Sequence, residues 1–217
     1  MQVFVIGAAG GIGRRLGRLL TARGDAVTGM HRAADQAATV RDTGATPVPG
    51  DLIADSAQDL AARFAGHEAV VFSAGAHGTG MDRTTAIDGE GLVKAAAAAA
   101  GAGVRRFVLV SAFPEAGRGR AERSAGFEHY MHIKKAADAH LVTTDLDWVI
   151  VRPGTLTNEP GTGRIAAGPA LEYGTVPRDD VAAFLAAVLH EPAVSRTIVE
   201  LTAGSTPVAE AVAALAR

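Results

Sequence analysis

Residues 3–20 read VFVIGAAGGIGRRLGRLL, and this stretch decides the fold. Val3 to Ile6 form a continuous apolar run, which is typical of a strand buried on both faces of a parallel sheet. From Ile12 to Ala22 the apolar residues recur at helical spacing. The loop between these segments consists almost wholly of small residues: Gly7, Ala8, Ala9, Gly10, Gly11, Ile12 and Gly13.

The glycines of this loop predict a phosphate-binding turn. A pyrophosphate can approach a tight turn closely only where no Cβ stands in the way. The helix that follows offers free N–H groups and a partial positive charge at its N-terminus. The alternative is a purely structural turn, but the position between a strand and a helix favours dinucleotide binding. We therefore expect the cofactor to contact six loop residues: Gly7, Ala9, Gly10, Gly11, Ile12 and Gly13.

The chain as far as Val151 alternates between short strands and longer helices. Further strands are expected at Ala26 to Met30, Thr46 to Val48, Ala69 to Ser73, Arg106 to Val110 and Trp148 to Val151. Helices are expected at Ala34 to Arg41, Ala57 to Ala65, near Asp82 to Ala102, and at Phe127 to Thr143. Because each crossover places a helix over the sheet, this order predicts an α/β, doubly wound parallel sheet of the Rossmann type with helices on both faces.

Beyond Pro153 the pattern becomes irregular. A Gly/Pro-rich stretch extends to Gly174, followed by an expected helix at Asp179 to His190, a strand at Thr197 to Leu201 and a helix near Val208 to Leu215. Since no linker or internal repeat divides the chain, we expect a single domain over residues 1–217. Residues 154–217 should contribute a small C-terminal portion that forms most of the substrate side of the cleft.

Composition narrows the class of protein. The 217 residues are 48% apolar and 20% charged, with a formal net charge of −2. A nucleic-acid surface usually shows a basic excess, so no nucleic-acid partner is expected. Without cysteine, thiolate metal sites and disulfides are excluded. Neither a signal sequence nor a membrane span is evident, so we expect a cytoplasmic monomer or small homo-oligomer that binds a small-molecule substrate.

The end of the second expected strand favours NADP(H) over NAD(H). An acidic side chain there would bind the ribose 2′-hydroxyl, whereas arginine suits a 2′-phosphate. The sequence reads Thr28-Gly29-Met30-His31-Arg32, with no acid. Arg14, just past the third glycine, is a second candidate cation near the same phosphate. The alternatives are a solvated loop residue for Arg32 and a helix surface residue for Arg14.

Four further stretches complete a resemblance to a known family. These are Gly50-Asp51-Leu52, Ser73-Ala74-Gly75, Arg152-Pro153-Gly154-Thr155-Leu156-Thr157 and Val176-Pro177-Arg178-Asp179-Asp180-Val181-Ala182. With the glycine loop, they resemble the atypical short-chain dehydrogenase/reductases, in particular the NAD(P)H-binding proteins related to biliverdin/flavin reductase and NmrA-like regulators. The resemblance covers nearly the whole chain.

The resemblance implies further cofactor contacts. It places Asp51 near the adenine amino group with Leu52 beside it, and it places Ser73, Ala74 and Gly75 beneath the adenosine. Pro153 and Gly154 would lie beside the nicotinamide. For Asp51 the alternative is a turn or helix-cap residue after Gly50, and the Arg-Pro-Gly segment could simply end a strand.

Conventional members of the family use a serine and a Tyr-x-x-x-Lys motif, and this chain has both. Ser111 follows the fifth expected strand, and Tyr130 and Lys134 are four apart on one helix, so they share a face. Tyrosine could donate the proton that accompanies hydride transfer while serine holds the carbonyl oxygen. Lys134 would bind the ribose hydroxyls, and its ammonium and the oxidised nicotinamide should lower the tyrosine pKa from its reference of about 10. The alternatives are a packed Tyr130 and a pair between Lys134 and Asp138.

Other side chains are weaker candidates. His129 and His132 have a spacing that can bind metal, but no third ligand is evident, so no metal site is expected. One segment with several glycines carries three arginines, Arg118, Arg120 and Arg123. It could form a lid over the substrate or a solvated surface loop. Trp148 is expected in the core.

The favoured hypothesis is an NADP(H)-dependent reductase of a small carbonyl, quinone or flavin-like acceptor, with the nicotinamide over Gly154. The main alternative, implied by the NmrA-like branch, is a non-catalytic redox sensor that reports NADP(H) to a partner. A third, an epimerase or dehydratase, would need a sugar-sized cleft, and the C-terminal part is expected to be too short to form one.

Overall fold

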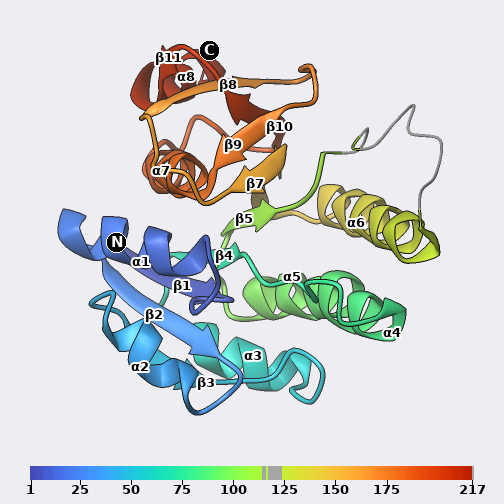
Figure 1. The fold of residues 1–217 in the computed structure, drawn as a ribbon. Helices are drawn as coiled ribbons and strands as arrows, with labels where there is room; N and C mark the ends of the chain where they lie inside the picture. Colours follow the sequence, from blue (N-terminus) through green and yellow to red (C-terminus); the bar gives the residue numbers. More distant parts are fainter. Residues whose placement is uncertain (114–115, 117–123, 217) are drawn as a thin grey trace.

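A mostly parallel sheet with helices on both faces forms the centre of the molecule, as the sequence predicts (Figure 1). The computed structural model describes residues 1–113, 116 and 124–216. Its parallel strands are β1 (Gln2–Ile6), β2 (Ala26–His31), β3 (Thr46–Pro49), β4 (Ala69–Phe72), β5 (Arg106–Val110), β6 (Asp147–Pro153) and β10 (Thr197–Ala203). Across the sheet they run β3-β2-β1-β4-β5-β6-β10, so the order switches direction between β1 and β4. Doubly wound sheets bind ligands at this switch.

Alternating side chains on each strand build two separate cores. In β1, Val3 and Val5 belong to one buried cluster, while Phe4 and Ile6 belong to the other. The first cluster includes residues of α1 (Gly13–Arg23), α2 (Gln36–Arg41), α7 (Arg178–Leu189) and α8 (Val208–Leu215). The second includes residues of α3 (Ala57–Phe64), α5 (Gly91–Gly101) and α6 (Ala125–Val142). Burial from both sides explains why the strands read as continuous apolar runs.

The long helix expected near Asp82 to Ala102 is interrupted. It consists of α4 (Met81–Thr84), a π-helical turn (Thr85–Glu90) and α5. The π-helical turn contains Asp88, which is only 2% exposed. Such turns are rare and occur often at functional sites. No helix in the described part of the chain is long and apolar enough to cross a membrane.

After Pro153, the expected helix, strand and helix are present as α7, β10 and α8, but the Gly/Pro-rich stretch before them also forms strands that the sequence does not indicate. β8 (Arg164–Gly168) pairs antiparallel with β10, and β11 (Thr206–Pro207) pairs antiparallel with β8, so these two strands extend the central sheet. β7 (Thr155–Thr157) and β9 (Thr175–Pro177) form a separate parallel pair. These strands are two to five residues long, too short to give a clear pattern in the sequence, so partners distant in the sequence decide their structure.

The first turn of α7 ties the C-terminal part of the chain to the glycine loop. Asp180 accepts hydrogen bonds from the backbone N–H groups of Thr162 and Gly163, at 3.0 and 2.8 Å. Asp179 forms an ion pair with Arg15 of α1. Arg15 in turn donates to the carbonyl oxygen of Gly11 at 2.8 Å. The segment that precedes β8 and the glycine loop are therefore held by one short stretch of α7.

The other end of α7 is held by a buried arginine. Arg106, on β5, donates from its guanidinium to the carbonyl oxygens of Val194 at 2.7 Å, Val188 at 2.6 Å and Glu191 at 3.3 Å. The last carbonyls of a helix have no partner inside the helix. Arg106 thus satisfies the end of α7 and the turn that follows it.

Candidate functional site

Two neighbouring cavities open where the parallel strands end, at the switch between β1 and β4. The smaller, about 270 Å³, is called here the adenosine cavity and is lined by residues that follow β1, β2, β3 and β4. The larger, about 680 Å³, is called the acceptor cavity and reaches from the glycine loop to β5 and α6. Gly10 and the Ser73–Ala76 segment line both cavities, so the two are continuous along the carboxyl edge of the sheet.

The glycine loop is shaped as a bare backbone turn. Gly7 has a φ of +81°, and a Cβ on it would lie 2.7 Å from the Ala74 nitrogen, so only glycine fits. The N-terminus of α1 has no side-chain cap and no acidic residue in its first turn. The Arg14 N–H donates to the Gly10 carbonyl oxygen at 3.0 Å, but no side chain takes up the other N–H groups of the first turn, and the helix dipole adds a favourable field for an anion there. These features fit the pyrophosphate of a dinucleotide.

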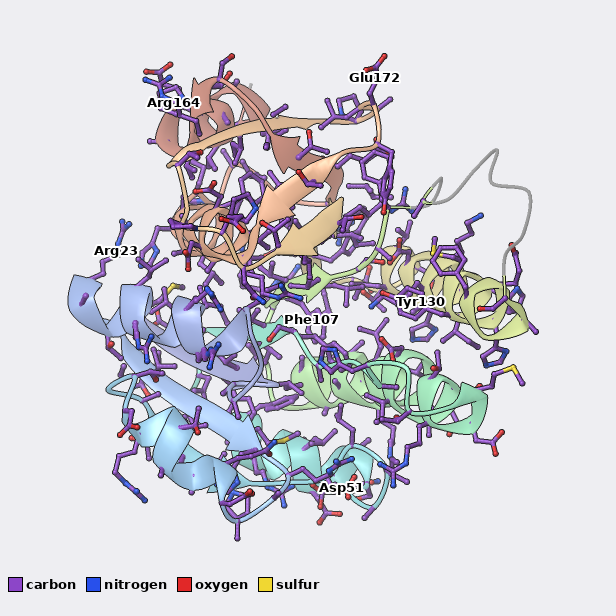
Figure 2. All side chains as sticks on the ribbon, viewed as in Figure 1. Arg23, Asp51, Phe107, Tyr130, Arg164 and Glu172 are labelled. Atoms are coloured by element: carbon purple, nitrogen blue, oxygen red, sulfur yellow. The ribbon has the colours of Figure 1, made fainter. Side chains whose placement is uncertain are left out.

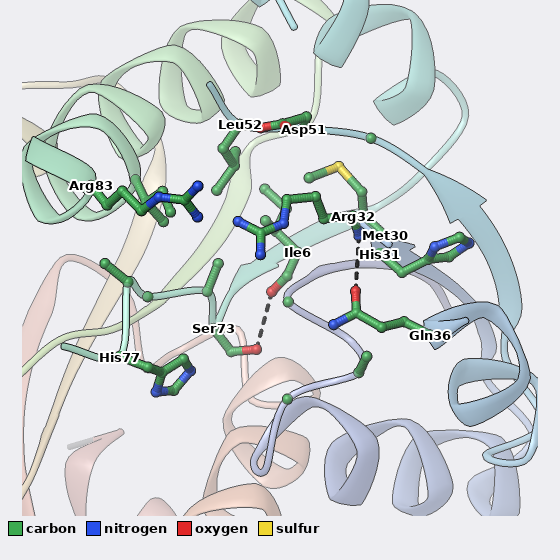
Figure 3. A pocket seen from close by; sticks show the side chains of 18 of the residues that line it. Ile6, Met30, His31, Arg32, Gln36, Asp51, Leu52, Ser73, His77 and Arg83 are labelled. Atoms are coloured by element: carbon green, nitrogen blue, oxygen red, sulfur yellow. Dashed lines mark hydrogen bonds between the residues drawn. The ribbon is translucent and has the colours of Figure 1, made fainter. Parts of the chain in front are cut away.

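The adenosine cavity brings together most of the predicted adenosine-side residues (Figure 3). Asp51, Leu52, Ser73, Ala74, Gly75 and Arg32 all line it. Asp51 also makes a turn, because its Oδ1 accepts a hydrogen bond from the Ile53 N–H at 2.8 Å. The cavity-lining role and the turn role proposed for Asp51 are therefore compatible.

Ser111, Tyr130 and Lys134 line the acceptor cavity together. Lys134 is 3% exposed, and its Nζ donates to the Val110 carbonyl oxygen at 3.1 Å. The same Nζ lies 3.5 Å from Oδ1 of Asp88, whose Oδ2 accepts a hydrogen bond from the Ala76 N–H at 2.9 Å. The Lys134 ammonium is thus paired with Asp88. The alternative predicted from the sequence, a pair with Asp138, is not formed.

The pKa of Tyr130 is shifted opposite to the expected direction. Burial raises it, and the carboxylates of Asp88 and Asp138 raise it further. Asp88 lies beside Lys134, so the ammonium does not dominate the field at the phenol. In the protein alone Tyr130 therefore keeps its proton well above neutral pH.

Behind Ser111 lies a second buried charge pair. Nε of Arg152 donates to Oδ2 of Asp138 at 2.9 Å, and burial raises the pKa of the Asp138 carboxyl, although Ser111 and Arg152 oppose the rise. Oδ1 of Asp138 and the Ser111 hydroxyl are buried without a hydrogen bond of ordinary geometry. Because the interaction with Ser111 lowers the Asp138 pKa, the Ser111 hydroxyl lies against this carboxylate, at the wall of the acceptor cavity.

Several predicted residues do not reach the cavities. Arg14 is exposed on α1 and lines neither cavity. Pro153 and Gly154 are buried and line neither cavity, and Gly154 has no room for a Cβ against the Gly174 carbonyl. Trp148 is in the core, at the end of β6 opposite the cavities.

The weaker candidates have other surroundings. His129 bonds to Thr85 Oγ1 at 2.8 Å, and no cluster of three metal-ligating side chains occurs among the residues described. Arg118, Arg120 and Arg123 lie outside the described residues.

Several lining residues were not identified from the sequence, among them Arg83, His77, Asp88 and Arg178. Arg83 and His77 line the adenosine cavity, and His77, Asp88 and Arg178 line the acceptor cavity. Arg178 lies against Gly11, where a Cβ would come within 2.9 Å of its Cδ, and it donates to Asn158 Oδ1 at 3.0 Å. His77 has a φ of +50°, which is rare for a residue with a side chain. Only Arg178 had a sequence signal, as a member of the stretch at 176–182.

The chain resembles known proteins over almost its full length. Residues 7–192 match a family model described as NAD(P)H-binding. A Bacillus subtilis protein named an uncharacterized sugar epimerase is 40% identical over 213 residues, 97% of this chain and 98% of that protein.

The fold is also similar to that of solved structures over nearly the whole chain. A Bacillus halodurans protein, titled as a candidate NAD-dependent epimerase/dehydratase, matches with a TM-score of 0.89 and 33% identity over 99% of each chain. The anaerobilin reductase ChuY of Escherichia coli O157:H7 matches with a TM-score of 0.78 and 26% identity, over 94% of this chain and 97% of ChuY.

Proposed function

Since the chain belongs to the NAD(P)H-binding family, we propose that it is an NADP(H)-dependent reductase that transfers a hydride to a small carbonyl, quinone or flavin-like acceptor. The observation that carries the proposal is the acceptor cavity, in which Ser111, Tyr130 and Lys134 face one space that continues into the glycine loop. The similarity to ChuY, a reductase by its title, supports the same class of reaction.

The residues around the two cavities fit NADP(H). The glycine loop and the uncapped N-terminus of α1 would hold the pyrophosphate, with Arg178 beside Gly11 as a further cation. Arg32 would pair with the 2′-phosphate, because guanidinium groups bind phosphates through two parallel hydrogen bonds. When bound, the cofactor supplies the hydride.

The chain itself would bind the acceptor and supply the proton. The protonated Tyr130 hydroxyl would donate its proton to the acceptor oxygen, and the Ser111 hydroxyl, which lines the same cavity, would hold that oxygen in place. Lys134 would donate to ribose hydroxyls from the position fixed by Val110 and Asp88. An apolar cluster of Phe113, Met131, Phe127, Tyr130 and Leu171 adjoins this side and suits a planar, apolar acceptor.

Equilibrium binding tests the cofactor assignment. By calorimetry at matched salt, NADPH should bind more tightly than NADH, and Arg32→Ala should weaken NADPH at least about tenfold, since a hydrogen bond to a charged group contributes about 1.5–3 kcal/mol. Arg14→Ala is the control and should have no effect, because Arg14 lies outside both cavities. Failure to bind either nucleotide would remove the basis of the proposal. The fluorescence of Trp148 is not a suitable measure of nucleotide binding, because this tryptophan lies in the core.

Turnover separates the reductase from a redox sensor. We expect NADPH oxidation with a quinone, flavin or small carbonyl acceptor, and a loss of about 10²-fold or more in kcat for Tyr130→Phe, the usual scale for a general acid. The affinity for NADPH should stay the same, because the phenol is assigned to the acceptor. NADPH binding without turnover of any of these acceptors would favour the sensor.

The names of two relatives favour a second candidate, an epimerase or dehydratase. The acceptor cavity of about 680 Å³ has the size of an ordinary small-molecule site, so the short C-terminal part does not argue against a sugar. An epimerase regenerates its cofactor in each cycle. Conversion of a nucleotide sugar with no net consumption of nicotinamide would therefore support this candidate over the reductase.

A further inference from the structure

Two arginines from different parts of the chain point into the adenosine cavity. Arg32 follows β2, and Arg83 belongs to α4; their guanidinium groups face one another across the cavity (Figure 3). No hydrogen bond or ion pair joins either guanidinium to another residue in the described ranges 1–113, 116 and 124–216. Both groups are thus available to a ligand.

The electrostatics of this arrangement point to an anion. Two cations that face one space repel each other unless a negative charge lies between them. The acidic side chain in the cavity lining is Asp51, and one of its oxygens is occupied by the Ile53 N–H. A phosphate monoester, with up to two negative charges and three acceptor oxygens, would match two guanidinium groups.

The backbone on both sides of the cavity is fixed. The Gln36 side-chain oxygen accepts hydrogen bonds from the N–H groups of Arg32 and Ala33, both at 3.1 Å, and so holds the turn that carries Arg32. Arg83 lies one turn before Ile87, which lines the same cavity. One helix face therefore carries both the Arg83 cation and, at Ile87, an apolar side chain against which an adenine ring can pack.

We propose that Arg83 is a specificity residue for the cofactor: with Arg32 it forms a two-arginine clamp on the ribose 2′-phosphate. This inference rests on the proposed NADP(H) dependence and adds to it a residue from α4, on the opposite side of the cavity from the turn after β2. In this clamp a single ligand group, the 2′-phosphate, would pair with both guanidinium groups.

A pair of nucleotides that differ only in the 2′-phosphate tests the clamp. The affinities of adenosine 2′,5′-bisphosphate and adenosine 5′-monophosphate are measured by calorimetry for the wild type, Arg83→Gln, Arg32→Gln, the double variant and the control Arg14→Gln. Arg83→Gln should weaken the bisphosphate about tenfold or more and the monophosphate less than about twofold. The double variant should bind both nucleotides alike, and Arg14→Gln should match the wild type.

The outcomes separate the clamp from the proposed function. Equal losses for both nucleotides would mean that Arg83 stacks on the adenine, which overturns the clamp. A wild type that prefers the bisphosphate and keeps this preference in Arg83→Gln also overturns the clamp but leaves the NADP(H) assignment intact. A wild type without any preference for the bisphosphate overturns both. Since both arginines are exposed, unchanged melting temperatures should show that the variants fold.

Discussion

Replacing Lys134 with methionine is expected to lower the free energy of unfolding by about 3–5 kcal/mol, the cost of breaking a buried ion pair. The substitution leaves the Asp88 carboxylate, 2% exposed, with the Ala76 N–H as partner and no neighbouring ammonium. Urea denaturation followed by fluorescence of the buried Trp148 measures the change. NADPH affinity of the folded variant should also fall, because the ammonium is assigned to the ribose hydroxyls.

The double variant Asp88→Asn/Lys134→Met is the control for this result. Without either charge, most of the lost stability should return, so the two substitutions should not be additive. The loss of NADPH affinity should remain, since the ammonium is still missing. Additive losses in stability would contradict the assigned pair and would mean that each side chain is stabilised by other groups.

Replacing Arg106 with leucine is expected to lower the free energy of unfolding by at least about 3 kcal/mol. Three carbonyl oxygens near the end of α7 would lose a hydrogen bond from a charged group, and each such bond contributes about 1.5–3 kcal/mol. The Val188 and Glu191 oxygens would keep a backbone N–H donor at 3.1 Å. Chemical denaturation measures the loss.

The neighbouring Arg105 provides a matched control for this experiment. Its side chain is 67% exposed and lies 3.7 Å from an Asp147 oxygen. Arg105→Leu should change stability by less than about 1 kcal/mol, as is usual for an exposed ion pair. Equal effects at the two positions would show that the buried hydrogen bonds of Arg106 contribute little.

The parallel half of the fold could be predicted because each of its segments carries a strong local signal. The run Val3 to Ile6 must be apolar on both faces because helices cover both faces of the sheet. β8 and β11 carry no such signal: β8 contains Ala166, Ala167 and Gly168, and only its pairing with β10 makes it a strand. The π-helical turn was missed for a similar reason, since helical spacing does not indicate a local change of pitch.

The residues of the candidate site also fall into those that a local sequence signal predicts and those that it does not. Residues in motifs, such as Asp51, Ser111 and Lys134, could be named because type and position together point to a role. Arg83 and Asp88 lie in a helical segment with no motif, and they line the cavities because of tertiary packing, which includes the contacts of that segment with α6. The Tyr130 pKa was expected to fall because of Lys134, four residues away, and an oxidised nicotinamide, but the sequence shows neither the burial that raises this pKa nor the carboxylate of Asp88 beside the lysine. Arg14 follows the motif in sequence yet lies on the exposed side of α1.

Asp88 has a consequence for how this protein can change during evolution. One oxygen of its carboxylate accepts a hydrogen bond from the N–H of Ala76, which lines both cavities, and the other faces Lys134, which lines the acceptor cavity. A substitution at this position alters both cavities at once. A change at Asp88 that favours a new acceptor would therefore also alter cofactor binding. The cluster around Phe113 and Leu171 has no such link to the adenosine side. We therefore expect homologues with different acceptors to diverge around this cluster and to keep a carboxylate on the π-helical turn.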